Sequence, residues 1–152
     1  MINENELISR VLHEEEQAQA MAAQLAEAAG RGDMAELSAT ADRLRGVLDR
    51  ELEAHLAMEE MDLFPVLAKR GLAPEVAVAV QQHTELRRRR HDLSQIPPGD
   101  GAGLRRCFRQ LADDLQRHIR FEADFLYVDL YRREADAFRA DVDGALSTMK
   151  ET

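Results

Sequence analysis

Apolar residues recur every three or four positions over most of the chain, which is the pattern of amphipathic helices with one face in a core. Turn signals divide this pattern into four long segments at about residues 5–29, 34–70, 74–93 and 103–133. Pro65 is expected to kink the second segment near its end, and Pro74 fits the first turn of the third. Four helices with short connections predict an all-α fold, the up-down antiparallel four-helix bundle.

The last residues of the chain carry a separate, shorter pattern. Phe138, Val142 and Leu146 are spaced four residues apart, which predicts one small helix lying against the bundle. We therefore expect a bundle domain over residues 1–132 and a short C-terminal helical tail over residues 133–152.

The composition limits the classes of function that the chain can have. Of its 152 residues, 45% are hydrophobic and 32% charged, as in a soluble globular domain. The single cysteine, Cys107, indicates a reducing compartment, and the N-terminus does not resemble a secretory signal, so we expect a cytoplasmic protein. The net charge of −9 argues against nucleic-acid binding, and no stretch is apolar enough to span a membrane.

Three of the predicted helices carry ionisable residues on the face that should enter the core. These residues are His55 and Glu59 in the second helix, His83 in the third, and His118 and Glu122 in the fourth. The apolar stripes that they interrupt are Leu44, Leu48, Leu52 and Leu63; Val76, Val80 and Leu86; and Leu104, Cys107, Leu111, Leu115 and Phe125. Burying such groups without partners costs several kcal/mol each, so something in the core must compensate them.

A metal site is the interpretation that best explains these residues. A histidine and a glutamate four residues apart lie one turn apart on one helix face, so both can bind one metal ion or a metal pair. Two such pairs and a further histidine supply the nitrogen and carboxylate ligands that suit iron, manganese or zinc. The alternative is a buried network of hydrogen bonds without metal, in a bundle that has a structural role.

The order of these residues resembles a known protein family. The stretches HLAMEEMDLFP (55–65) and HIRFEADFLY (118–127), with a histidine on the helix between them, are similar to the hemerythrin-like (HHE cation-binding) domain. The similarity covers about residues 5–132 and implies a bundle with a non-haem di-iron site. In that site the three histidines would be terminal iron ligands, and Glu59 and Glu122 would bridge the two irons.

The family usually takes one more histidine from the first helix, where this chain has the run His13-Glu14-Glu15-Glu16. At about 100° per residue, Glu14 and Glu15 flank the apolar face, whereas His13 lies nearly opposite it among polar neighbours. Glu15 also fits the family spacing, because apolar residues lie four positions before it and three, seven and ten after it. We therefore predict that Glu15 replaces the family histidine, with His13 as the second choice and Glu14 as the third.

A second departure from the family lies on the third helix. Arg87 stands where oxygen-carrying hemerythrins have another histidine, four residues after His83. We expect Arg87 to turn partly inward and to pair with a carboxylate. We also expect His91 to lie on the surface and Cys107 to pack in the core.

A site with three histidines and three carboxylates would favour ferric iron or manganese and would disfavour simple reversible oxygen carriage. We expect a di-iron protein that binds or senses oxygen or a related small oxidant, rather than an enzyme. Alternatives are turnover of peroxide or nitric oxide, iron handling, and repair of iron–sulfur centres. The sequence identifies no protein partner.

Overall fold

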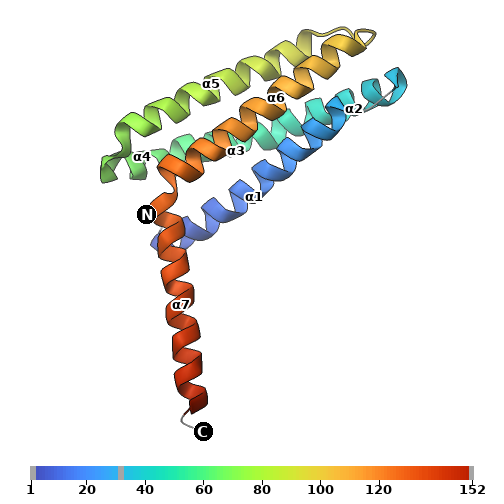
Figure 1. Cartoon of the computed structure of the whole chain (residues 1–152). Helices are drawn as coiled ribbons and strands as arrows, with labels where there is room; N and C mark the ends of the chain where they lie inside the picture. The colour runs from blue at the N-terminus through green and yellow to red at the C-terminus, as the bar shows by residue number, and fades with distance from the viewer. Residues whose placement is uncertain (1–2, 31–32, 151–152) are drawn as a thin grey trace.

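The structure, a computed structural model, describes residues 3–30 and 33–150, and its four helical legs alternate in direction (Figure 1). The first leg is α1 (Glu4–Ala29). The second consists of α2 (Met34–Val47), η1 (Leu48–Leu52), α3 (Glu53–Met58), η2 (Glu59–Leu63), α4 (Phe64–Leu67) and η3 (Ala68–Leu72), where η marks a π-helical turn. The third is α5 (Ala73–Gln95), and the fourth is α6 (Gly101–Phe121) with η4 (Glu122–Leu126). The predicted all-α four-helix bundle is therefore confirmed.

Local signals set the ends of the legs. Asn3 begins α1 by accepting a hydrogen bond from the backbone N–H of Glu6, whose side chain bonds back to the Asn3 backbone. Gly71 joins the second leg to α5 at a φ of 94°, a conformation that glycine adopts without steric cost. The turn predicted at residues 30–33 includes residues 31–32, which lie outside the described residues. No described helix is long and apolar enough to cross a membrane.

The apolar core consists of two clusters. The larger contains residues of α1, the first half of the second leg, α5 and α6, including Leu25, Leu44 and Phe108. The smaller contains Leu7 and Val11 with residues from η2, α4, α5 and the end of the fourth leg. Cys107 lies in the larger cluster and His91 is exposed, as the sequence predicted.

Each leg contributes residues to both clusters, and an ionisable residue lies between these two sets of apolar residues on every leg. Those residues are Glu15, Glu59, His83 and Glu122. The candidate ligands therefore form a polar level between two apolar regions, whose packing fixes the four legs relative to one another.

A π-helical turn explains where the predicted apolar stripe of the fourth leg fails. Phe125, predicted in the core, is 56% exposed, while Leu126 and Tyr127 are buried. In η4 the N–H of Tyr127 donates to the carbonyl of Glu122, five residues earlier, so one extra residue shifts the buried face along the chain. On α5 the prediction for Val80 is also wrong, because this residue is 40% exposed and Ala79 is buried instead.

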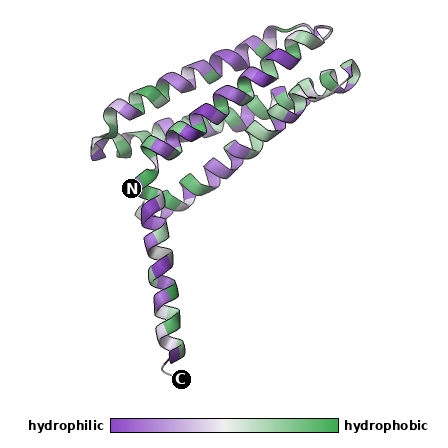
Figure 2. Ribbon diagram, in the orientation of Figure 1, coloured by the Kyte–Doolittle hydropathy of each residue, from purple (hydrophilic) through white to green (hydrophobic). Residues whose placement is uncertain are grey.

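The chain beyond η4 differs from the predicted short tail. The fourth leg ends at Leu126 rather than near Arg133, and a 23-residue helix follows, α7 (Val128–Lys150). Its first turn packs against the smaller cluster through Leu130. The rest extends away from the bundle (Figure 1), with hydrophobic and hydrophilic residues along its length (Figure 2). The side chain of Phe138, named in the predicted tail, lies outside the described residues.

Candidate metal centre

Six ionisable residues from the four legs are buried at the polar level between the clusters. They are Glu15 on α1, His55 on α3, Glu59 at the start of η2, His83 on α5, His118 on α6 and Glu122 at the start of η4. Glu15 and His55 are 5% and 3% exposed, and the other four side chains have no exposure. These are the six residues that the sequence singled out.

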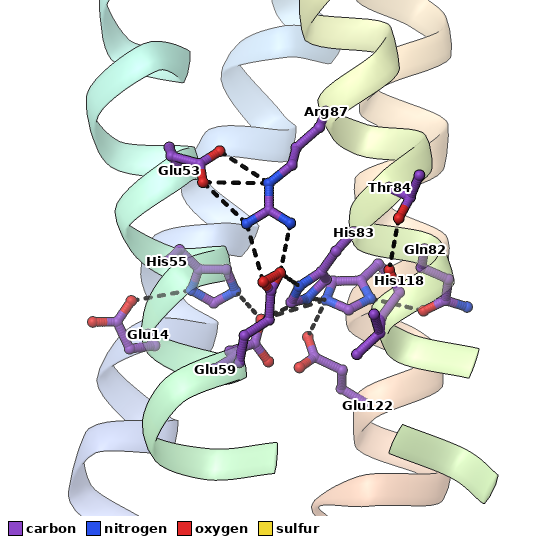
Figure 3. A network of polar contacts seen from close by, with 12 residues as sticks. Glu14, Glu53, His55, Glu59, Gln82, His83, Thr84, Arg87, His118 and Glu122 are labelled. Atoms are coloured by element: carbon purple, nitrogen blue, oxygen red, sulfur yellow. Dashed lines mark hydrogen bonds and ion pairs between the residues drawn. The ribbon is translucent and has the colours of Figure 1, made fainter. Parts of the chain in front are cut away.

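Glu59 lies at the middle of this group (Figure 3). Its Oε1 lies 2.8 Å from Nε2 of His55 and 3.4 Å from Nε2 of both His83 and His118. Its Oε2 accepts a hydrogen bond from the hydroxyl of Tyr127, which is itself fully buried. One carboxylate is thus surrounded by three imidazoles and a phenol.

The donor atoms are close enough to share a cation. One atom from each of four residues, His55, Glu59, His118 and Glu122, lies within 4.8 Å of the others. His118 Nε2 lies 3.1 Å from Glu122 Oε1 and 3.1 Å from His83 Nε2. Two ring nitrogens at that separation with carboxylate oxygens around them form a donor set typical of transition-metal sites.

Each of the three histidines uses its other ring nitrogen, Nδ1, to contact an oxygen outside the centre. The partners are Glu14 for His55 at 3.0 Å, Glu60 for His83 at 3.1 Å, and Gln82 for His118 at 2.7 Å. These oxygens can accept a hydrogen bond from Nδ1, and the tautomer that is protonated at Nδ1 leaves Nε2 free to bind a metal ion at the centre. Metal-binding histidines typically have such partners, which fix the tautomer that a metal requires.

Several buried atoms at the centre have no hydrogen-bond partner among the described residues. They are Oε2 of Glu15, Nε2 of His55 and both carboxylate oxygens of Glu122. A buried polar atom without a partner costs about 1–3 kcal/mol, and a charged one costs more. A cation held among His55, Glu59, His118 and Glu122 would give the unpartnered atoms of His55 and Glu122 a partner, so these residues fit a bound metal ion.

The surroundings at the centre shift the pKa values of the Glu15 and Glu59 carboxyl groups in opposite directions. Burial, and next the charges of Glu59 and Glu14, raise the pKa of Glu15 to about 8. Burial also acts to raise the pKa of Glu59, but contacts with the three histidines outweigh it and leave this pKa well below its ordinary value. Burial and the charge of Glu59 raise the pKa of Tyr127 well above its usual range. Without metal at neutral pH, Glu59 is therefore ionised, while Glu15 and Tyr127 keep their protons.

Arg87 binds carboxylates outside the centre, as its sequence position predicted. Its Nη2 donates to Glu53 at 3.0 Å and to Glu60 at 3.1 Å, and Glu60 also contacts His83 Nδ1. These contacts lower the pKa of Glu60 against the opposing effect of its partial burial. Arg87 thus holds the outer partner of His83 in place.

The run on α1 divides between the surface and the interior. His13 and Glu16 are exposed, Glu14 is half-buried beside His55, and Glu15 is buried. Consecutive helical residues point about 100° apart, so one member of the run can face directly into the core. That member is Glu15.

Sequence reasoning missed the residues that support the centre. The roles of Glu14 and Gln82 as histidine partners depend on side-chain directions that helical periodicity does not give. Tyr127 follows Glu122 by five residues, so it would face Glu122 across one π-helical turn. An uninterrupted α-helix would turn it away from the core.

Comparison with known proteins supports a metal site. The sequence model of the hemerythrin HHE cation binding domain matches residues 6–130, which is most of the chain. The searches of curated proteins and of solved structures give no match. The family match and the converging histidine and glutamate side chains together indicate that the chain binds metal.

Replacing Glu14 with alanine is expected to lower metal affinity about 10- to 100-fold, because His55 loses the oxygen that fixes its tautomer. Competition with a coloured chelator measures this affinity. Glu16→Ala is the matched control, since it removes the same charge from an exposed position two residues away, and its affinity should stay unchanged. Equal losses in both variants would contradict the role given to Glu14.

In protein stripped of metal, the free energy of unfolding should fall as the pH rises from about 4.5 to about 8. Over this range the folded protein retains a proton on Glu15 that the unfolded chain releases, so deprotonation favours unfolding. Each unit of pKa shift contributes about 1.4 kcal/mol. Urea titrations of Glu15→Gln should show a shallower pH dependence, and the exposed control Glu16→Gln should not. An unaltered slope in Glu15→Gln would refute this assignment.

Proposed function

The chain belongs to the hemerythrin HHE cation-binding domain family, and on that basis we propose that it binds two non-haem iron ions and uses them to bind or sense oxygen or a related small oxidant. The observation that carries the proposal is the convergence of His55, Glu59, His118 and Glu122 in a core with unpartnered donor atoms. In this proposal the irons would be held by the imidazoles of His55, His83 and His118 and by the carboxylates of Glu59, Glu122 and Glu15, the last of them from α1.

The chemistry of the donors supports iron over zinc in this proposal. Three imidazoles and three carboxylates are mixed nitrogen and oxygen ligands, which suit iron and manganese, whereas structural zinc sites have four ligands and are rich in thiolates. When bound, iron would supply redox chemistry that the side chains lack. The carboxylate-rich set favours the ferric state and therefore a sensing or reacting role over reversible oxygen carriage.

The surroundings of the centre favour a small, uncharged ligand. Apolar clusters enclose it on two sides, so bulk water and large molecules are excluded. A depression of about 350 Å³ between α1 and the second leg is lined by residues including Glu14, Met21, Arg50 and His55. Because His55 lines it, this depression is the candidate entrance for a molecule such as oxygen.

Turnover of peroxide is the second candidate function, and a protonated group beside the centre favours it. The phenol of Tyr127 keeps its proton at neutral pH. Proton donors at this position are what reduction of an oxygen–oxygen bond requires. Glu15 would have to release its proton when its carboxylate binds a cation, so metal binding is coupled to pH.

Elemental analysis of protein reconstituted with ferrous iron without oxygen is expected to give about two iron ions per chain, the stoichiometry of a carboxylate-bridged pair. Absorption spectra after addition of oxygen and then peroxide separate the two functions. A stable charge-transfer band that reverses on reduction supports binding or sensing, and rapid loss of peroxide supports turnover. Protein that binds no transition metal under these conditions would contradict both.

The Glu15→Ala variant is expected to lose about one iron ion per chain, because the pair loses its only ligand from α1 in this proposal. His13→Ala removes the exposed residue of the same run and should leave the iron content unchanged. Circular dichroism establishes that both variants remain helical. Full iron content in Glu15→Ala, or loss in His13→Ala, would reverse the choice between the two residues.

A further inference from the structure

The sequence of α7 carries the spacing of a coiled-coil seam. Apolar residues alternate at intervals of three and four, which places them at the a and d positions of a seven-residue repeat. These residues are Val128, Tyr131, Ala135, Phe138, Val142, Ala145 and Met149. The spacing continues without interruption for three repeats, so the seam forms one stripe along the helix.

The bundle covers only the start of this seam. Val128 and Tyr131 are half-buried, and Tyr131 packs against the smaller apolar cluster. Farther along, Ala135 and Ala145 are exposed, Val142 is 40% exposed, and Leu146, next to the seam, is 49% exposed. The family match ends at residue 130, and α7 continues to Lys150. Most of the seam thus lies outside the part of the chain that builds the metal centre.

A solitary helix of this length is marginally stable in water, and Gly144 weakens it further. Packing of the seam against a partner would stabilise it. The partner has to present a complementary apolar stripe of the same length and charges that match those flanking the seam.

The charges that flank the seam identify a second copy of the chain as this partner. Arg132 and Arg139 occupy e positions, and Glu134 and Asp141 occupy g positions. In a parallel pair, Glu134 of each copy faces Arg139 of the other, whereas an antiparallel pair would bring like charges together. We propose that α7 forms a parallel two-stranded coiled coil with α7 of a second copy.

Two further observations favour this arrangement. Val142, at an a position beyond the part of the seam that the bundle covers, is β-branched, which favours two strands. The arginines at e positions now make exposed pairs within their own helix, Arg132 with Asp129 at 3.5 Å and Arg139 with Asp136 at 3.8 Å. Exposed pairs of this kind are worth little, so they do not compete with contacts across the seam.

An anionic membrane surface is the other occupant that an amphipathic helix could have. Helices that lie on such surfaces are rich in lysine and arginine on their polar face. The polar face of α7 has four basic and five acidic residues, so it lacks the positive charge that this binding needs.

Sedimentation equilibrium of the full chain over a range of concentrations tests the proposal, and the wild type is expected to dimerise. Val142→Glu places a charge in the seam and should weaken the dimer roughly tenfold or more. Ala140→Glu makes a matched change on the opposite face of α7 and should leave dimerisation unaltered. A wild type that stays monomeric throughout, equal effects of both variants, or seam-dependent binding to anionic vesicles would overturn the proposal.

A charge exchange tests the parallel orientation. Arg139→Glu and Glu134→Arg should each weaken self-association, because each places like charges across the parallel seam. Mixing the two variants should restore a dimer, since both cross-pairs then carry opposite charges. Single variants that associate as well as the wild type, with no gain on mixing, would refute the parallel coiled coil. Iron content serves as an independent readout, and none of these exposed changes should alter it.

Discussion

The ionised carboxylate of Glu59, in a place with no solvent exposure, is the constraint on which the rest of the structure depends. A buried charge is tolerated only where other groups compensate it. Here the compensation comes from three imidazoles on three different helices and from the hydroxyl of Tyr127. These groups can meet only if the four legs cross at the same level. The two apolar clusters above and below that level hold the legs in this register.

The histidines that surround Glu59 are themselves held by hydrogen bonds to residues farther from the centre. Each imidazole is fixed at Nδ1 by an oxygen, and all three of these oxygens come from a helical leg other than that of the histidine they contact. Glu60 bonds in the same way across to His83 and is itself fixed by Arg87. The donors at the centre are therefore oriented before any cation arrives, on helices rather than loops, which is the condition for strong and selective metal binding. Arg87 stands in place of the expected histidine, so the site has one fewer possible ligand. The arginine instead holds Glu60, the partner of His83, in position.

The sequence predicted the bundle and the buried histidines and glutamates because helical periodicity decides which residues face inward. It also distinguished Glu15 from His13, since two residues of helix correspond to about 200° of rotation. It failed where the periodicity itself changes. The π-helical turn after Glu122 exposes Phe125 and buries Tyr127. No simple sequence pattern predicts the extra residue that such a turn contains. Polar partners such as Gln82 could not be predicted, because their contacts depend on side-chain rotamers. The start and length of α7 could not be predicted either, because its apolar spacing continues that of the fourth leg.

Tyr127 gives the metal centre a mechanical connection to the far end of the molecule. Its hydroxyl ends on a carboxylate oxygen of Glu59, and its backbone leads within one residue into α7. Leu130, one turn farther on, is anchored in the same apolar cluster. A displacement of Glu59 must either break this hydrogen bond or carry the root of α7 with it. Tyr127 therefore links the position of Glu59 directly to the start of α7, the helix that reaches away from the bundle.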